Sequence, residues 1–222
     1  MRREAQRWAV LGVCLLAAVA AGCSDPAAQL DSDDPAARIE AVKALARKDS
    51  DAAADKICEA VNTRDLITAQ TAVRSLSQMN APRAQAALKE IATREPRWEL
   101  RQEAATALGY RRDESSPEVL RQLVRTDPDP QVRAAAATAL GRVGSPGDIP
   151  LMVEVLLADE DVRVQGRAVG AIERFVGVRF MFDETAPPQE RRKRLEEIQA
   201  EATRMLNWMK GAKAHEQRRT NP

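Results

Sequence analysis

Apolar residues recur along the chain with a period of about 32 residues. The motif Ala-x-x-Ala-Leu aligns five segments, and their Leu or Ile positions lie 31, 32, 32 and 32 residues apart. The aligned positions are Ala41/Ala44/Leu45, Ala72/Ser75/Leu76, Ala104/Ala107/Leu108, Ala136/Ala139/Leu140 and Ala168/Ala171/Ile172. Because spacings of three and four residues place side chains on one face of a helix, each segment predicts an amphipathic α-helix.

A second apolar stripe follows twelve and fifteen residues after each of the first four leucines. Its members are Ile57 and Ala60, Leu88 and Ile91, Leu120 and Leu123, and Met152 and Val155. Helix starts are indicated by an N-cap residue followed by proline, at Asp34-Pro35, Ser116-Pro117 and Asp129-Pro130. Turns are indicated at Asn80-Ala81-Pro82 and at the GSPGD segment, residues 144–148.

Each repeat of about 32 residues therefore contains two short helices and two turns. This predicts an all-α fold, an α-α superhelix of about five two-helix repeats. Only 3% of the residues are aromatic, so the core is built from Ala, Leu, Val and Ile. Alanines at the aligned positions allow helices to approach closely. We expect Ala136 to lie in such a contact and Ala137, one step round the helix, to lie outside it.

The fourth segment, DPQVRAAAATALGRVG, and the third, WELRQEAATALGYR, resemble the HEAT-like repeats of the phycobilisome-lyase type. The resemblance covers residues 33–182. The chain departs from the pattern in three segments. The first lacks the Val before Arg38, and the second keeps only the apolar frame. In the fifth, Gln165 replaces the arginine.

In HEAT proteins an Asp and an Arg of successive repeats form a ladder across the inter-helix turns. The resemblance implies this structural role for Arg133 with Asp129 and for Arg38 with Asp34. At the corresponding position before Arg101 the chain has Arg97.

Residues 187–210 form an amphipathic segment with dense charge on one side. Its apolar face comprises Leu195, Ile198, Ala202, Met205, Leu206 and Met209. Because a repeat stack needs a polar outer side at its end, we expect a capping helix. The alternative is a partner-binding amphipathic helix. Residues 211–222 are expected to be a disordered tail.

The first residues resemble an export signal, with Arg2, Arg3 and Arg7 followed by an uncharged apolar run and a small-residue processing site. Residues 20–23, Ala-Ala-Gly-Cys, resemble the lipobox of bacterial lipoproteins. The resemblance implies a signal peptide at 1–22, acylation of Cys23 and a tether at 23–32, and Ser24 favours the outer membrane. The alternative is cleavage after residues 18–20, Ala-Val-Ala, which releases a soluble periplasmic protein.

The chain has 34 basic and 33 acidic residues, and removing residues 1–22, with three Arg and one Glu, leaves 31 and 32. This balance does not favour nucleic-acid binding, which depends on many phosphate contacts. The sequence also lacks a recognisable catalytic set, since His215 is the only histidine and lies in the tail. Cys58 is expected to be a buried small residue. We expect no metal, no cofactor and no enzymatic activity.

Nine residues after each position of the arginine ladder, five residues occupy equivalent, outward-facing positions on the first helices of the five repeats. The row consists of Arg47, Gln78, Tyr110, Arg142 and Arg174. Lys43 and Arg74 lie one turn earlier, and Arg111 and Arg112 follow Tyr110. The resemblance to HEAT proteins implies that these helices line the concave face. Because Arg and Tyr are enriched in interfaces, the row is a candidate protein-binding surface. The alternative is a solvated ridge.

Two functions are compatible with these features. The first is a lipid-anchored, non-catalytic HEAT-repeat scaffold that binds a protein partner in the bacterial cell envelope. The second is an enzyme or a bilin-handling protein, which the phycobilisome-lyase resemblance suggests.

Overall fold

The computed structural model describes residues 25–111 and 113–220, with backbone alone for 215, 216 and 218–220. The predicted signal peptide, Cys23 and Arg112 lie outside the described residues, as does the His215 side chain.

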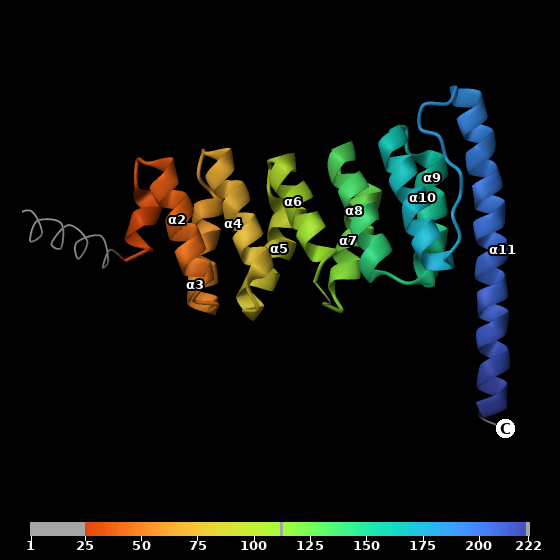
Figure 1. Cartoon of the computed structure of the whole chain (residues 1–222), viewed down its shortest axis with the longest axis horizontal. Helices are drawn as coiled ribbons and strands as arrows, with labels where there is room; N and C mark the ends of the chain where they lie inside the picture. The colour runs from red at the N-terminus through yellow and green to blue at the C-terminus, as the bar shows by residue number, and fades with distance from the viewer. Residues whose placement is uncertain (1–24, 112, 221–222) are drawn as a thin grey trace, which may run out of the picture. The chain divides into compact units, whose positions relative to one another are not determined.

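The described residues form ten α-helices and two short 3-10 helices, with no β-strand among them (Figure 1). The first helices of the five repeats are α2 (Pro35–Ala46), α4 (Leu66–Gln78), α6 (Trp98–Leu108), α8 (Pro130–Val143) and α10 (Val162–Val176). The second helices are α3 (Asp51–Val61), α5 (Pro82–Arg94), α7 (Ser116–Thr126) and α9 (Ile149–Ala158). The long α11 (Pro188–Thr220) follows the fifth first helix. The predicted all-α repeat fold is confirmed.

Aspartate side chains begin four of the five first helices. The carboxylates of Asp34, Asp65, Asp129 and Asp161 each accept a hydrogen bond from the backbone N–H two residues later. These N-caps satisfy a backbone donor that has no partner within the helix. Proline follows Asp34 and Asp129 at the first helical position, where its missing N–H costs nothing.

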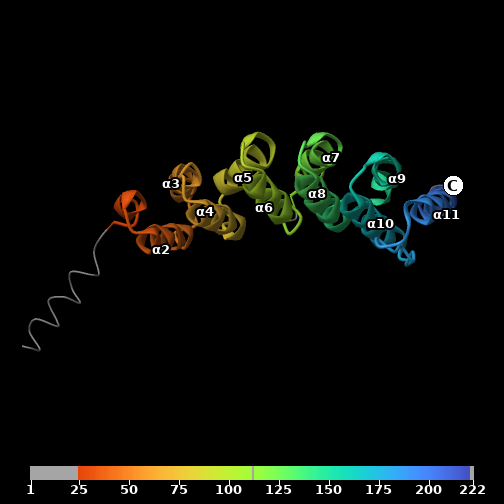
Figure 2. The ribbon, with the colours of Figure 1, turned by 90° about the horizontal axis from the view of Figure 1, so that it is seen from above.

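The chain divides into two compact units, one ending at Arg83 and one beginning at Ala84, and each is described on its own. In the first unit α2, α3 and α4 pack against one another. In the second unit α6, α8 and α10 form one layer while α7 and α9 lie in another (Figure 2). Because each repeat of such a stack contacts mainly its neighbours, either unit keeps its own core.

The aligned alanines and leucines form that core. The five Leu or Ile positions of the repeat motif are at most 3% exposed. Of the aligned small residues, Ala44 is half-buried and the others are buried. The stripe on the second helices is buried as well, from Ile57 at 0% to Ile91 at 8% exposed.

The expectation for Ala137 is wrong, because this residue is as fully buried as Ala136, at 0% exposed. The periodicity assigned α8 a single apolar face. In the structure α8 packs against α6, α7 and α10, so a wider arc of its surface is covered.

The arginine ladder is present, but its carboxylate partners differ from the expected ones. Arg133 donates to both oxygens of Asp159, at 2.7 and 3.0 Å, while Asp129 caps its own helix. Arg101 makes the same paired contact with Asp127, at 2.8 and 2.9 Å. These partners lie in the turn that precedes the next repeat, so each pair joins two successive repeats.

In the first unit Arg38 donates to Asp65 at 3.1 Å, and not to Asp34, which caps α2. The Arg38 side chain also donates to the carbonyl oxygens of Ser32 and Asp33. The ladder arginines are therefore structural, as the resemblance implied, but the expected partner four residues earlier is incorrect. Each guanidinium instead reaches the turn before the next repeat, where Asp65, Asp127 or Asp159 accepts its hydrogen bonds.

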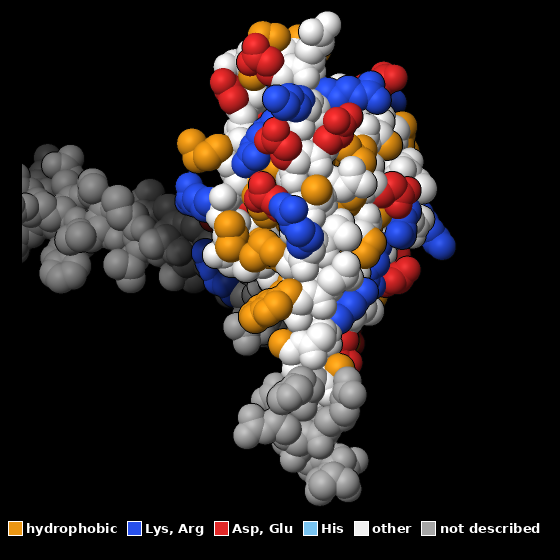
Figure 3. Space-filling model, turned by 90° about the vertical axis from the view of Figure 1, so that its right-hand side faces the viewer, with side chains coloured by type: hydrophobic (Ala, Val, Ile, Leu, Met, Phe, Trp, Pro, Cys, Tyr) orange, Lys and Arg blue, Asp and Glu red, His pale blue; other side chains and the backbone are white. Residues whose placement is uncertain are grey.

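The first half of α11 packs on α9 and α10, burying Leu195, Ile198, Ala202 and Leu206. This contact agrees with a capping role. Met205 and Met209 are half-buried, and Trp208 is 73% exposed. On the face seen from this end of the chain, charges of both signs are interspersed with exposed apolar side chains (Figure 3).

The helix continues through Thr220, whereas a disordered tail was expected from residue 211. Residues 211–220 include several good helix formers, Ala, Lys, Glu, Gln and Arg, and contain no proline, so propensity allows the helix to extend. None of the helices in the described part of the chain, α11 included, has the length and apolar character required to cross a membrane.

Candidate interaction surface

The predicted row lies at the C-terminal ends of the first helices, and every member is exposed. Its residues are Arg47, which caps α2, Gln78, the last residue of α4, Tyr110, just after α6, Arg142 in the last turn of α8 and Arg174 in the last turn of α10. We call these five residues the recognition row. Arg47 and Gln78 belong to the first unit, and the other three belong to the second.

Two glycines set the spacing of the recognition row in the second unit. A Cβ atom on Gly109 would lie 2.6 Å from the Ala139 Cβ, and one on Gly141 would lie 2.9 Å from the Ala171 Cα. Since carbon atoms in contact are normally about 3.5–4.0 Å apart, neither position accepts a larger residue without movement of the helices. The glycines therefore allow α6, α8 and α10 to approach closely just beside Tyr110 and Arg142.

This close approach produces direct contact between members of the row. The Arg142 guanidinium lies over the Tyr110 ring, 4.4 Å from the ring centroid. At an exposed site such a cation–π contact stabilises by about 0.5–1 kcal/mol. The Arg174 Cδ passes 3.5 Å from the place where a Gly141 Cβ would stand. Tyr110 and Arg142 are thus in direct contact, and Arg174 packs beside Gly141, the residue before Arg142.

The chemistry of this surface suits protein recognition. Tyr110 is 70% exposed, so its ring offers a large apolar area beside the Arg142 guanidinium. Tyrosine and arginine are over-represented among the residues that contribute most to protein–protein binding. Arg111, which was expected to contribute, is half-buried, and Arg112 lies outside the described residues.

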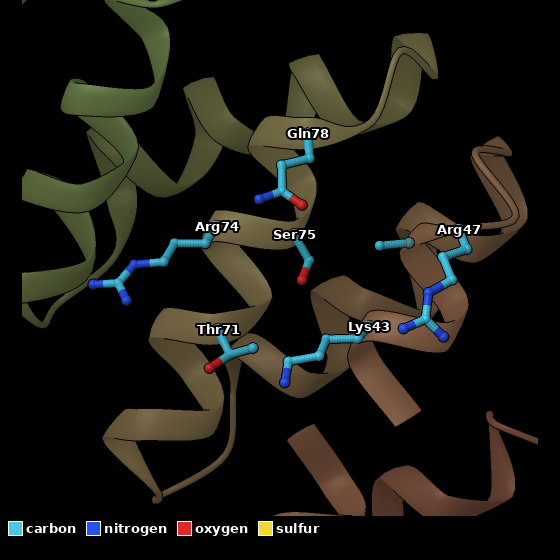
Figure 4. Close-up of a pocket in the computed structure, with 7 residues that line it drawn as sticks. Lys43, Arg47, Thr71, Arg74, Ser75 and Gln78 are labelled. Atoms are coloured by element: carbon cyan, nitrogen blue, oxygen red, sulfur yellow. The ribbon is translucent and has the colours of Figure 1, made fainter. Parts of the chain in front are cut away.

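The first unit has a pocket of about 550 Å³ between α2 and α4 (Figure 4). The lining residues are Lys43, Ala46 and Arg47 from α2 and Thr71, Arg74, Ser75 and Gln78 from α4. On each helix these positions follow the i, i+3, i+4 spacing of one helix face, at 43, 46 and 47 on α2 and at 71, 74, 75 and 78 on α4. Lys43 reaches from α2 toward α4, whereas Arg74 extends away from Lys43 and Arg47 (Figure 4).

Positive charge dominates this pocket, since each of its charged lining residues is a Lys or an Arg. The Lys43 ammonium donates to the Glu40 carboxylate at 2.8 Å, one turn away and outside the pocket lining. This hydrogen bond, together with the nearby charge of Arg47, lowers the pKa of Glu40. Glu40 therefore stays ionised at neutral pH.

The remaining candidates do not converge on a chemical site. Within the described residues, His, Cys, Asp and Glu side chains form no group of three that could hold a metal ion. Cys58 is half-buried on α3, more exposed than the sequence suggested. Arg101 and Arg133 are engaged in the ladder, and Asp127 raises the pKa of Arg101 through its hydrogen bonds. These residues hold the repeats together.

Sequence reasoning placed the recognition row outward but missed what surrounds it. Thr71, which lines the pocket, directly precedes the aligned motif of the second repeat, and Ser75 stands at one of its aligned small-residue positions, so neither was singled out as a site residue. The signal that could have indicated the Tyr110–Arg142 contact is the glycine directly before each residue, at 109 and 141, exactly one repeat apart.

A family model of HEAT repeats matches residues 25–107 and 87–173. Among solved structures, the complex of CpcE and CpcF of phycocyanin lyase from Nostoc sp. contains a chain that matches with a TM-score of 0.50 at 24% identity. That match covers 68% of this chain and 64% of the other, so this chain spans less than two thirds of that protein.

Two engineered proteins also match, with TM-scores of 0.42 and 0.44 at 26% and 23% identity. These matches cover 68% and 82% of this chain and 77% and 96% of the engineered ones. No curated protein matches the chain.

Proposed function

The chain belongs to the HEAT-repeat family, and we propose that it works as a non-catalytic scaffold that binds a protein partner through the second-unit part of the recognition row, Tyr110, Arg142 and Arg174. The observation that carries this proposal is the direct contact of the exposed Tyr110 and Arg142, with the exposed Arg174 packed beside Gly141. Side chains on such a surface are held in register by the close helix contacts beneath them, so a partner meets a surface that is already ordered.

We further propose that the scaffold is anchored to the bacterial cell envelope by a lipid on Cys23. The support is the signal-like segment 1–22 and the lipobox resemblance at 20–23, with Ser24 favouring the periplasmic side of the outer membrane. The test is Cys23→Ala, which is expected to abolish membrane retention and leave the melting temperature of the repeats unchanged. A variant that still sediments with membranes, from a parent that metabolic palmitate does not label, contradicts the anchor.

A second candidate function is the handling of a bilin. The similar chain in the phycocyanin lyase complex and the repeat resemblance support it, although 24% identity establishes the shared fold alone. The absorbance spectrum of the purified protein separates the two functions, since a bound tetrapyrrole absorbs in the visible. Tetrapyrrole absorbance that co-purifies with the protein favours the bilin function over the scaffold.

The scaffold function is tested by capture of partners after cross-linking in intact envelopes. We expect Tyr110→Ala combined with Arg142→Glu to weaken capture of the most enriched partner at least tenfold, because one change removes contact area and the other reverses a charge. Both residues are exposed, so the circular dichroism spectrum and melting temperature are expected to stay close to those of the parent.

The matched control is Arg204→Glu, an exposed position on α11. It reverses a charge outside the recognition row and is expected to leave capture intact. If the control loses capture while the double variant retains it, the binding surface lies on α11 and the recognition row is not the site.

A further inference from the structure

We propose that the pocket between α2 and α4 binds carboxylate side chains of an acidic peptide segment. This inference rests on the proposed binding function and narrows it, because it assigns a ligand chemistry to the first unit. The pocket is lined by Lys43, Arg47 and Arg74 and by no acidic residue.

The charges are arranged for more than one carboxylate. Lys43 and Arg47 lie one turn apart on α2, and Lys43 extends toward α4 while Arg47 stays on the α2 side (Figure 4). Cations that are distributed along a helix match carboxylates that are distributed along a chain. A guanidinium also binds a carboxylate through two parallel hydrogen bonds.

The uncharged lining residues supply groups that a peptide backbone requires. Ser75 and Gln78 both line the pocket from α4, and Ser75 is only 5% exposed. The Gln78 amide can donate to a carbonyl and accept from an N–H, as each peptide unit of a ligand demands. Thr71 contributes its methyl group, because its hydroxyl already donates to the Ile67 carbonyl at 2.8 Å.

The size of the pocket agrees with a peptide segment. Its volume of about 550 Å³ falls within the roughly 300–1,000 Å³ of sites that hold an organic ligand. A single phosphate or sulfate ion leaves most of this space to water and contacts fewer of the separated donors. A peptide carboxylate and a free phosphate or sulfate ion are both oxyanions. The experiment must therefore distinguish binding of the peptide from binding of a free ion.

The ion pair between Lys43 and Glu40 does not block the site. Both side chains are exposed, at 47% and 63%, and exposed pairs of this kind are weak because water screens them. A peptide carboxylate that reaches Lys43 and Arg47 together replaces one weak contact with two.

The probe is a fluorescein-labelled octapeptide of alternating Glu and Gly, measured by fluorescence anisotropy with the chain from Cys23 onward carrying Cys23→Ser. The matched control peptide has Gln in place of Glu. We expect binding of the acidic peptide alone, and binding that weakens with added NaCl because the contacts are partly exposed. Lys43→Gln combined with Arg47→Gln is expected to weaken this binding at least tenfold.

Further measurements distinguish binding in this pocket from nonspecific electrostatic attraction to the protein. Ser75→Ala leaves the charge unchanged and is expected to weaken peptide binding about threefold through one lost hydrogen bond. Arg204→Gln removes an exposed cation of α11, outside the recognition row, and is expected to leave peptide binding unchanged. Inorganic phosphate at 1 mM and matched ionic strength is expected not to displace the peptide.

The inference is overturned if the Lys43 and Arg47 double variant binds the acidic peptide as the parent does, or if the Gln peptide binds equally. Displacement by phosphate assigns the pocket to a free oxyanion and also overturns it. If the peptide fails to bind while Tyr110→Ala with Arg142→Glu abolishes partner capture, the scaffold function stands without the pocket. If the pocket binds the peptide while that variant captures normally, the Tyr110–Arg142 surface is not the partner site and the pocket stands.

Discussion

Gly109→Ala tests whether the close contact of α6 with α8 sets the geometry of the recognition row. Gly109 has φ −73° and ψ −10°, a conformation that alanine adopts without strain, so backbone freedom is not the reason for glycine here. The reason is space. The added Cβ would lie 2.6 Å from the Ala139 Cβ and 2.7 Å from its Cα, and the Cα belongs to the backbone and cannot rotate away.

The magnitude follows from that distance. Restoring normal carbon–carbon contact requires the two helices to separate by roughly 1 Å. Overpacking of this kind costs about 1–3 kcal/mol. Alanine gains helix propensity over glycine, by about 1 kcal/mol in a helix interior, but Gly109 is a C-cap, where the gain is smaller. We therefore expect Gly109→Ala to lower the free energy of unfolding by about 1–3 kcal/mol.

The matched control is Gly170→Ala in α10. A Cβ on Gly170 meets no atom within 4 Å, so the propensity gain is unopposed and stability should rise by about 0.5–1 kcal/mol. Urea unfolding followed by far-ultraviolet circular dichroism measures both variants. The reasoning is refuted if Gly109→Ala is as stable as the parent while Gly170→Ala gains the expected stability.

Two more predictions concern the charged contacts. Asp127→Asn, which leaves the buried guanidinium of Arg101 without its carboxylate, should destabilise by about 3–5 kcal/mol in urea unfolding. Arg163→Ala, at a pair with a 49% exposed arginine, should cost far less, and equal losses would contradict the ladder. Burial opposes ionisation of Asp113, but hydrogen bonds from Lys89 and Ser115 outweigh it and lower its pKa. Its contribution to stability is therefore present above about pH 4, where an unfolded aspartate ionises, and is lost as the pH falls toward the folded-state pKa. Unfolding measured from pH 7 to pH 3 should show a smaller acid loss for Asp113→Asn than for the parent, and an unchanged slope would contradict the contact.

The repeat fold was predictable because its information is local. Alanine and leucine at spacings of three and four residues specify a helix face, and five copies of that face, at intervals of 31 or 32 residues, specify a stack. The same reasoning failed at Ala137, since a periodic pattern assigns one buried face per helix. How many neighbours surround α8 is a property of the stack, and Ala137 is small enough to be compatible with either side.

For the candidate surface, the sequence predicted the outward orientation of the side chains but not the contacts between them. An equivalent position on successive helices indicates that Tyr110 and Arg142 point the same way, but their contact at 4.4 Å depends on the distance between the helix axes. That distance is set by Gly109 against Ala139, two residues that the linear pattern does not pair. The pocket was missed for a similar reason, because its hydroxyls come from α4 and its cations mainly from α2.

The end of the arginine ladder shows that departures from a repeat can be as informative as its matches. Arg133 uses one guanidinium nitrogen for the Asp127 carbonyl, at 3.0 Å, and the others for the Asp159 carboxylate. Gln165, at the equivalent place in the fifth repeat, keeps the carbonyl contact alone, donating to the Asp159 carbonyl at 2.8 Å. A carboxylate partner for this position would come from the turn before a sixth repeat, and the apolar frame stops after residue 182. An arginine at 165 would bring a charge without that partner, so the neutral side chain fits the fifth repeat, after which α11 packs on α9 and α10.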